Sequence, residues 1–125
     1  MNGLVIDSSG WLEYFTGGRH AKTYSKYLQS DKKIWLPSLV IYEVYKKIAK
    51  EKSETQGLLA VTQMEGQSAG VITLDERLAL FAADVSLRYK LPMADAVIYA
   101  TALQQEATLV TSDEHFRELK DVVFI

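Results

Sequence analysis

Short apolar runs alternate with longer segments of helical periodicity along the chain. The runs have strand length and lie at 4–6, 34–36, 108–110 and 122–125, and a run at 71–73 is either a strand or an extended approach to the next helix. The helical segments lie at 9–15, 20–28, 37–52, 55–64, 74–89, 93–105 and 114–119. Strands alternating with helices predict an α/β fold with a largely parallel sheet. Because 125 residues is an ordinary domain size, we expect one domain over residues 1–125.

Two Thr-x-x-Glu patterns stand near expected helix starts. Thr73 with Glu76 precedes one apolar segment, and Thr111 with Glu114 precedes another. In such a capping box the hydroxyl accepts a hydrogen bond from a free backbone N–H of the first helical turn, and the Glu side chain reaches back. The patterns therefore predict capping boxes for the helices at 74–89 and 114–119.

The segment 93–105 is apolar on nearly every side, which is typical of a buried helix. Asp95 interrupts its first turn, and no Arg or Lys is close to it in sequence. Burying an unpaired carboxylate costs several kcal/mol, whereas the helix dipole returns only about 1 kcal/mol. Something else in the folded protein must therefore compensate for the Asp95 charge.

Four acids, Asp7, Glu43, Asp95 and Asp113, occupy similar places in the expected fold, at strand ends or in the first two turns of helices. Each has a structural explanation: Asp7 and Asp113 as N-caps, Asp95 as a dipole partner, and Glu43 as an ion-pair partner of Lys47. In a parallel sheet, however, these places lie along one edge, where open α/β sheets bind ligands. Four carboxylates meeting there repel one another unless cations or protons intervene. We expect them to hold divalent metal.

The chain has no cysteine and only two histidines, His20 and His115. Oxygen ligands favour Mg²⁺ or Mn²⁺, and a zinc site is improbable with this composition. We expect His115 to be an exposed or capping residue of the last helix rather than a ligand. One or two ions bound by carboxylates activate water for phosphodiester hydrolysis, with no need for a side-chain nucleophile.

The overall charge and hydropathy argue for a chain that works away from membranes. The net charge is −2, which is not the basic balance of many nucleic-acid binders, although bound cations would offset it. No apolar run approaches the ~20 residues of a membrane span, and no segment has the pattern of a signal peptide. Together with the absence of cysteine, this predicts a cytoplasmic protein.

Four segments of the chain resemble the PIN-domain nucleases: VIDSS at 5–9, YEV at 42–44, LPMADAVIYATA at 91–102 and LVTSD at 109–113. The small single-domain form resembles the VapC toxins of toxin–antitoxin pairs. The resemblance implies a three-layer α/β/α sandwich and a metal-dependent endoribonuclease. It also implies a cognate antitoxin as partner, an RNA substrate, and pairing of two toxin subunits into a homodimer.

The same resemblance assigns roles to individual residues. The catalytic residues match the family's acidic quartet, which is Asp7, Glu43, Asp95 and Asp113. Three of them, Asp7, Asp95 and Asp113, would bind Mg²⁺ or Mn²⁺ directly or through water, and Glu43 would position the attacking water. Supporting positions are filled by Ser8, Thr111 and Ser112.

A basic helix face is the candidate RNA-binding surface. Lys46, Lys47 and Lys50 share it, and Arg19 is a weaker candidate for binding RNA phosphates. A solvated helix face explains these lysines equally well. Two other functional classes also remain open: a phospho-receiver-like domain, and a non-catalytic α/β module that binds a protein partner.

Overall fold

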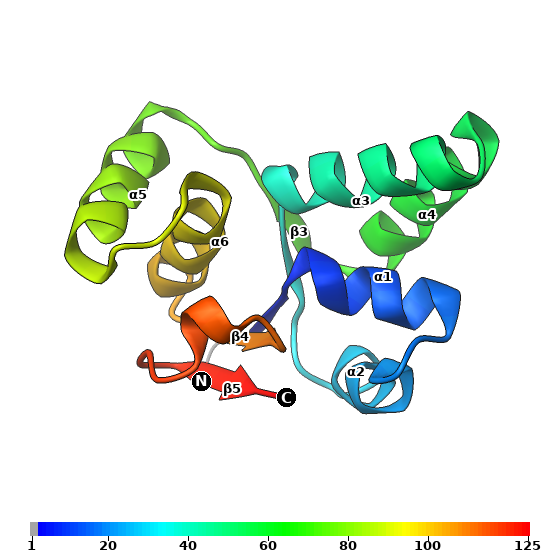
Figure 1. Cartoon of the computed structure of the whole chain (residues 1–125), viewed down its shortest axis with the longest axis horizontal. Helices are drawn as coiled ribbons and strands as arrows, with labels where there is room; N and C mark the ends of the chain where they lie inside the picture. Colours follow the sequence, from blue (N-terminus) through cyan, green and yellow to red (C-terminus); the bar gives the residue numbers. More distant parts are fainter. Residues whose placement is uncertain (1–2) are drawn as a thin grey trace.

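The computed structural model describes residues 3–125 as five strands, six α-helices and one 3₁₀ turn (Figure 1). In chain order the elements are β1 (Leu4–Ile6), α1 (Ser8–Thr16), α2 (Ala21–Leu28), β2 (Trp35–Pro37), α3 (Ser38–Glu51), α4 (Glu54–Gln67), β3 (Gly70–Ile72), α5 (Glu76–Tyr89), α6 (Met93–Gln104), β4 (Thr108–Thr111), η1 (Glu114–Phe116) and β5 (Val122–Phe124). The strands and helices expected from the sequence are present except for the helix at 114–119, which is a 3₁₀ turn, and the segment at 71–73 contributes to a strand. The α/β class is confirmed.

All the strands run parallel, in two sheets that adjoin each other. One sheet has the order β1-β4-β5, and the other pairs β2 with β3. A parallel bridge between Leu4 and Ile34 links them, together with a 2.8 Å hydrogen bond from the Leu4 N–H to the Lys33 carbonyl. The combined strand order is therefore β3-β2-β1-β4-β5, with β1 at the centre.

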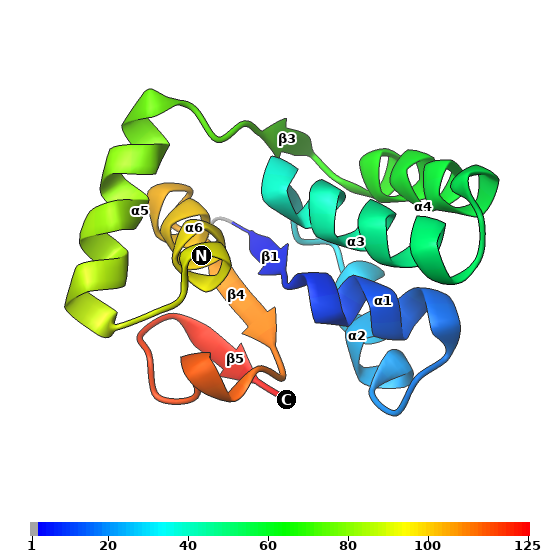
Figure 2. The ribbon, with the colours of Figure 1, turned by 45° about the horizontal axis from the view of Figure 1, so that its top comes forward.

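Helices flank the strands on two sides, as the sandwich expectation requires. Figure 2 shows α5 and α6 to the left of β1 and α1–α4 mainly to its right. Every residue of β1 and β4 is buried, and α6 is buried from Ala96 to Ala102. Within residues 3–125, no helix has both the length and the apolar composition needed to cross a membrane.

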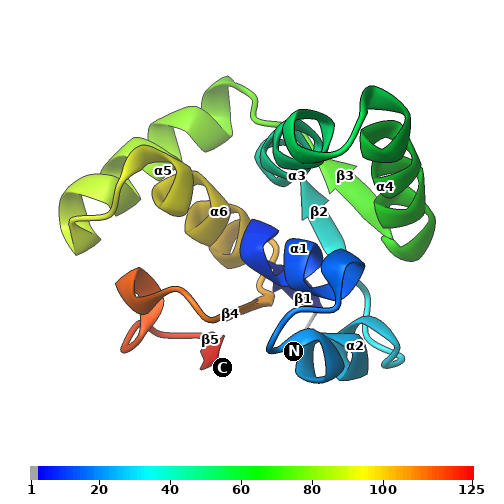
Figure 3. The same cartoon turned by 45° about the vertical axis from the view of Figure 1, so that its right-hand side comes forward.

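Three parallel strands end at the same edge of the fold, and this fixes the site. Ile6 at the end of β1 lies opposite Val110 in β4. The N–H of the next residue, Asp7, donates a hydrogen bond to the Val110 carbonyl at 3.1 Å. Strand β2 ends at Pro37, where α3 begins directly. Helix α6 follows α5 rather than a strand, and Asp95 lies in its first turn. Figure 3 shows the start of α1 beside α6 at this edge.

Both predicted capping boxes are wrong. Helix α5 begins at Glu76 rather than 74, because the Asp75 side chain accepts the Leu78 N–H at 2.9 Å and takes the cap position. The predicted last helix is only the 3₁₀ turn η1, capped by Asp113, whose Oδ1 accepts the His115 N–H at 2.9 Å. In both places a short aspartate side chain two residues after the threonine caps the element.

Candidate active site

Asp7 is the most buried acid of the four, with 4% of its surface exposed. It caps α1, because its Oδ1 accepts the Ser8 N–H at 2.8 Å. Its other oxygen, Oδ2, accepts the Thr111 hydroxyl at 2.7 Å across the β1–β4 pair. The N-cap explanation is therefore correct, but it accounts for one oxygen only. The second oxygen is held toward the strand that carries the next acid.

Thr111 joins the two strand ends. Its hydroxyl donates to Asp7 and accepts the Asp113 N–H at 2.9 Å, so the side chain uses both its donor and an acceptor. Thr111 is fully buried at the end of β4. The expected supporting position of Thr111 thus has a clear geometric basis: its hydroxyl fixes the distance between Asp7 and the Asp113 backbone.

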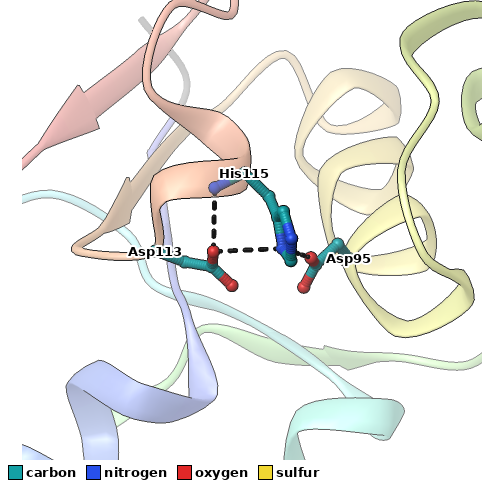
Figure 4. A group of neighbouring side chains, drawn as sticks. All are labelled: Asp95, Asp113 and His115. Atoms are coloured by element: carbon teal, nitrogen blue, oxygen red, sulfur yellow. Dashed lines mark hydrogen bonds and ion pairs between the residues drawn. The ribbon is translucent and has the colours of Figure 1, made fainter.

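Asp95 and Asp113 lie on either side of the His115 imidazole (Figure 4). His115 Nδ1 is 2.7 Å from Asp95 Oδ2 and 3.2 Å from Asp113 Oδ1. One ligand atom from each of the three residues lies within 4.8 Å of the others. The expectation that His115 would be exposed is correct, since 57% of its side chain is open to solvent. Its contact with the acid of α6 is what sequence reasoning missed.

Glu43 reaches the same cluster from the second turn of α3. Its Oε1 is buried and has no hydrogen-bond partner within the described part of the chain. The alternative pairing with Lys47 is absent, because Lys47 Nζ instead lies 3.0 Å from Glu51 Oε2. An unpartnered buried acceptor is costly and rare in a folded protein. Glu43 therefore keeps a buried oxygen without a partner, and the charge of Asp95 raises the pKa of its carboxyl.

The four acids share one electrostatic environment. Burial raises the pKa of Asp7, and the charges of Asp95 and Asp113 add to the rise, while the hydrogen bonds from Thr111 and Ser8 oppose it. The resulting pKa is about 6. Burial also raises the pKa of Glu43, opposed by a hydrogen bond with Ser8, and the Asp95 charge adds to the rise.

Asp95 is the centre of this coupling. Its pKa is raised by burial and by the Asp113 charge, while the contact with His115 lowers it. In turn, the hydrogen bond with Asp95 and the two acidic charges raise the pKa of His115. The Asp95 charge thus raises the pKa values of Asp7 and Glu43, and the Asp113 charge raises those of Asp7 and Asp95.

Tyr24 and Ser112 form a second support on the α1–α2 side of the cluster. The Tyr24 hydroxyl donates to Ser112 Oγ at 3.1 Å, and its ring is fully buried. The ring reaches this position because Gly10 has no side chain: a Cβ there would lie 2.4 Å from a Tyr24 ring carbon and 2.8 Å from Ile6. The glycine of α1 therefore has a packing reason linked to the site.

The candidate RNA-binding cations are exposed but differ in their contacts. Lys46 Nζ lies 3.2 Å from the Tyr42 hydroxyl, and Lys47 pairs with Glu51. Lys50 and Arg19 are exposed. Among residues 3–125, no lysine or arginine lies within ion-pair distance of the four acids. His115 is therefore the only potentially cationic side chain of that range within ion-pair distance of these acids.

The residues at this edge fit a divalent cation. They supply several carboxylate oxygens, one of them a buried acceptor without a partner, and no competing lysine or arginine. Hard cations with oxygen ligands, such as Mg²⁺ and Mn²⁺, suit this donor set, and the imidazole nitrogen is a ligand that Mn²⁺ accepts more readily. Asp95 and Asp113, two of the four predicted acids, thus form a candidate acidic cluster with His115, which was not expected as a ligand, and the joint site of all four acids stays a prediction.

Comparisons with solved structures find the same fold. A toxin–antitoxin complex from Klebsiella pneumoniae matches with a TM-score of 0.78 and 23% identity, over 96% of this chain and 95% of that chain. VapBC2 from Rickettsia felis, bound to a DNA fragment from its promoter, matches with a TM-score of 0.77 and 15% identity, over 98% of this chain and 96% of that chain. The Mycobacterium tuberculosis VapC20, described as a sarcin–ricin loop cleaving toxin, matches with a TM-score of 0.69 and 12% identity, over 85% of this chain and 86% of that chain.

Comparison of the sequence with family models and with curated proteins gives two results. No curated protein matches significantly. The PIN domain model matches residues 4–122, which takes in all four acids. The chain therefore belongs to the PIN domain family.

Proposed function

We propose that the protein is a metal-dependent endoribonuclease and the toxin of a type II toxin–antitoxin pair. One observation carries the proposal: Asp95, Asp113 and His115 bring one ligand atom each within 4.8 Å of the others, and Glu43 Oε1 is buried without a hydrogen-bond partner in residues 3–125. No lysine or arginine of that range lies within ion-pair distance of these acids. Membership of the PIN family supports the nuclease class.

Asp7, Asp95 and Asp113 would hold Mg²⁺ or Mn²⁺, as one or two ions, directly or through water. A bound ion of this kind supplies charge stabilisation and lowers the pKa of water for phosphodiester hydrolysis. The chain contributes the placement of these acids: Thr111 keeps Asp7 and Asp113 in register, and Ser8 donates its backbone N–H to Asp7. His115 contacts the two acids at the exposed side of the cluster.

Glu43 would orient the attacking water and accept its proton. Its unpartnered Oε1 and raised pKa suit a base better than they suit a structural acid. The exposed Lys46, Lys47, Lys50 and Arg19 would bind the RNA phosphates beside this edge. Lys50 and Arg19 carry no ion pair with any residue of 3–125, so binding a phosphate breaks no existing ion pair at either side chain.

The structural neighbours suggest the partners. Those from Klebsiella pneumoniae and Rickettsia felis are toxin–antitoxin complexes, and VapC20 is described as cleaving the sarcin–ricin loop, an RNA element. By extension, this chain would bind a cognate antitoxin protein, act on RNA in the cytoplasm and pair with a second copy of itself.

The test compares RNA cleavage by the purified chain with Mn²⁺ and with chelator, beside two matched variants. Asp95→Asn removes the acid at the centre of the cluster, and Asp31→Asn removes an exposed acid of the α2–β2 turn. We expect cleavage by the wild type and Asp31→Asn only with metal, and none by Asp95→Asn.

Isothermal titration with Mn²⁺ separates the other functional classes. Specific uptake that Asp95→Asn abolishes supports the metal site, whereas a pure protein-binding module takes up none. Metal uptake without RNA cleavage, joined to phosphate transfer onto an aspartate, would replace the nuclease by a phospho-receiver. Cleavage by Asp95→Asn at the wild-type rate would contradict the proposed site.

A further inference from the structure

His115 brings a nitrogen ligand to the acidic edge of the fold. Its Nδ1 lies 2.7 Å from Asp95 Oδ2 and 3.2 Å from Asp113 Oδ1, and Figure 4 shows the imidazole between the two carboxylates. Neighbouring ligand atoms of an octahedral ion are about 3 Å apart, since each lies about 2.1 Å from the ion. The nitrogen is thus already at ligand spacing from both oxygens, and the three atoms form one group within 4.8 Å.

Packing holds the imidazole in this place. Asp113 Oδ1 accepts the His115 N–H at 2.9 Å, which fixes the backbone of η1. The next residue, Phe116, is fully buried, and its ring centroid lies 6.1 Å from that of Tyr99. Tyr99 follows Asp95 by about one turn of α6. The turn η1 is therefore docked on α6 close to Asp95, and the core sets the contact between His115 and that acid.

A structural ion pair explains little of this arrangement. The His115 side chain is 57% exposed, and exposed ion pairs contribute little to stability because water screens their charges. Lysine or arginine would provide a positive charge at the same place, but the charged form of neither side chain has a lone pair to offer. A neutral imidazole with its proton on Nε2 has a lone pair on Nδ1, which makes it a common metal ligand. Histidine at this position can therefore contribute a ligand that a lysine or arginine could not.

From this geometry we infer that His115 Nδ1 binds the metal ion together with Asp95 and Asp113, and that this nitrogen makes the site select Mn²⁺ over Mg²⁺. The inference rests on the metal-dependent function proposed above, and it adds a ligand from outside the four acids. Mg²⁺ is bound mainly by oxygen ligands and keeps several waters, whereas nitrogen ligands favour first-row transition ions. The imidazole would therefore raise the affinity for Mn²⁺ and add none for Mg²⁺.

The contact between His115 and Asp95 also acts against Mg²⁺. The imidazole engages Asp95 Oδ2, an oxygen that a cation would use, at 2.7 Å. Mn²⁺ replaces this contact by binding both atoms, but Mg²⁺ has to break it without gaining the nitrogen. Removal of the imidazole should consequently weaken Mn²⁺ binding and leave Mg²⁺ binding unchanged or stronger.

Isothermal titration of the full chain without a histidine tag, at one fixed pH, tests the selectivity. We expect the wild type to bind Mn²⁺ more tightly than Mg²⁺. His115→Ala should raise the dissociation constant of Mn²⁺ at least about tenfold without raising that of Mg²⁺. His20→Ala is the matched control, because His20 at the start of α2 is the other histidine of the chain and lies outside the ligand group. It should change neither constant.

Pulsed electron paramagnetic resonance of bound Mn²⁺ identifies the ligand directly, because the nitrogen of a coordinated imidazole couples to the unpaired electrons of the ion. We expect this coupling in the wild type and in His20→Ala, and its loss in His115→Ala. Circular dichroism of each variant confirms the fold. The wild-type spectrum tests the inference even if a variant does not fold, and neither measurement depends on RNA cleavage.

Three results would overturn the inference: a wild type without nitrogen coupling, a coupling that persists in His115→Ala, or an equal loss of affinity for both ions in that variant. Each of them leaves the metal-dependent nuclease intact as long as Asp95→Asn abolishes metal uptake and cleavage. A wild type that takes up no metal would instead remove the proposed function together with this inference. The two proposals can therefore be told apart by their failures.

Discussion

Replacing Asp7 by Asn should abolish RNA cleavage and at the same time make the metal-free protein more stable. The second effect follows from the burial of Asp7, which raises the pKa of its carboxyl from 3.8 to about 6. Between these two pH values the folded protein holds a proton that the unfolded chain has released. The free energy of unfolding therefore falls as the pH rises through this range, and it stays low above about pH 6.

The size of the effect follows from the same two values. At 1.36 kcal/mol per pKa unit, the ionised carboxylate costs the folded state up to about 3 kcal/mol at neutral pH. Asn carries no charge, and its Oδ1 still accepts the Ser8 N–H. The Thr111 hydroxyl must find another acceptor, which costs about 1 kcal/mol. The net gain is about 2 kcal/mol, or about 8 °C in melting temperature for a domain of this size.

Urea denaturation in chelator, followed by circular dichroism at pH 7.5 and pH 4.5, measures this gain. The variant should exceed the wild type at the higher pH. At the lower pH the folded carboxyl is protonated while the unfolded one is still mostly ionised, so about 1 kcal/mol of the cost remains, and the lost Thr111 bond offsets it to leave a difference near zero. Asp31→Asn is the control, because Asp31 is exposed and its replacement should change neither value. An Asp7→Asn variant no more stable than the wild type at pH 7.5 would refute the argument from burial and mutual repulsion.

Three further predictions test the same edge of the fold. Mn²⁺ at 100 times its dissociation constant should raise the free energy of unfolding by about 2.7 kcal/mol, and with it the melting temperature. In chelator, Asp95→Asn should have a higher melting temperature than the wild type, because it removes one of the repelling charges. A melting temperature that does not change with metal would contradict the crowding of carboxylates. His115→Ala should raise the pKa of Asp95 further, because the imidazole contact lowers it, and carbonyl-detected NMR titration of Asp95 would show no change if the contact is absent in solution. Gly10→Ala should lower the free energy of unfolding by about 1–3 kcal/mol through overlap with Tyr24, whereas Gly66→Ala, with nothing within 4 Å, should not; equal urea midpoints would rule out the close packing.

The sequence predicted the elements well because most of them have a strong local signal. Leu4–Ile6 is a short apolar run before a turn, and α6 is apolar on nearly every side, so their types were clear without tertiary information. The helix starts were harder, because Thr73 and Asp75 are both acceptable caps and only the fold decides which side chain reaches an N–H.

The convergence of the acids was predictable from topology, but their partners were not. Parallel strands place Asp7 and Asp113 at one edge, and that inference needed only the order of strands and helices. The contact between His115 and Asp95 joins residues twenty positions apart through a single 3₁₀ turn. The only local signal for it was a histidine two positions after a cap aspartate, which sequence reasoning interpreted as solvent-exposed.

The direction of the pKa changes separates the structural from the functional explanation of these acids. A carboxylate that serves only as a cap or an ion-pair partner gains stability from its charge, so that its pKa falls, as it does for Glu114 beside Arg117. The pKa values of Asp7, Glu43 and Asp95 change in the opposite direction, and all three keep this rise against hydrogen bonds that lower it. The fold therefore keeps charges that destabilise it when no cation is bound, and such a conflict between local cost and overall stability is typical of a working site. A cation bound at this edge would relieve the repulsion between the carboxylates, and the free energy released by this relief would add to the affinity for the ion.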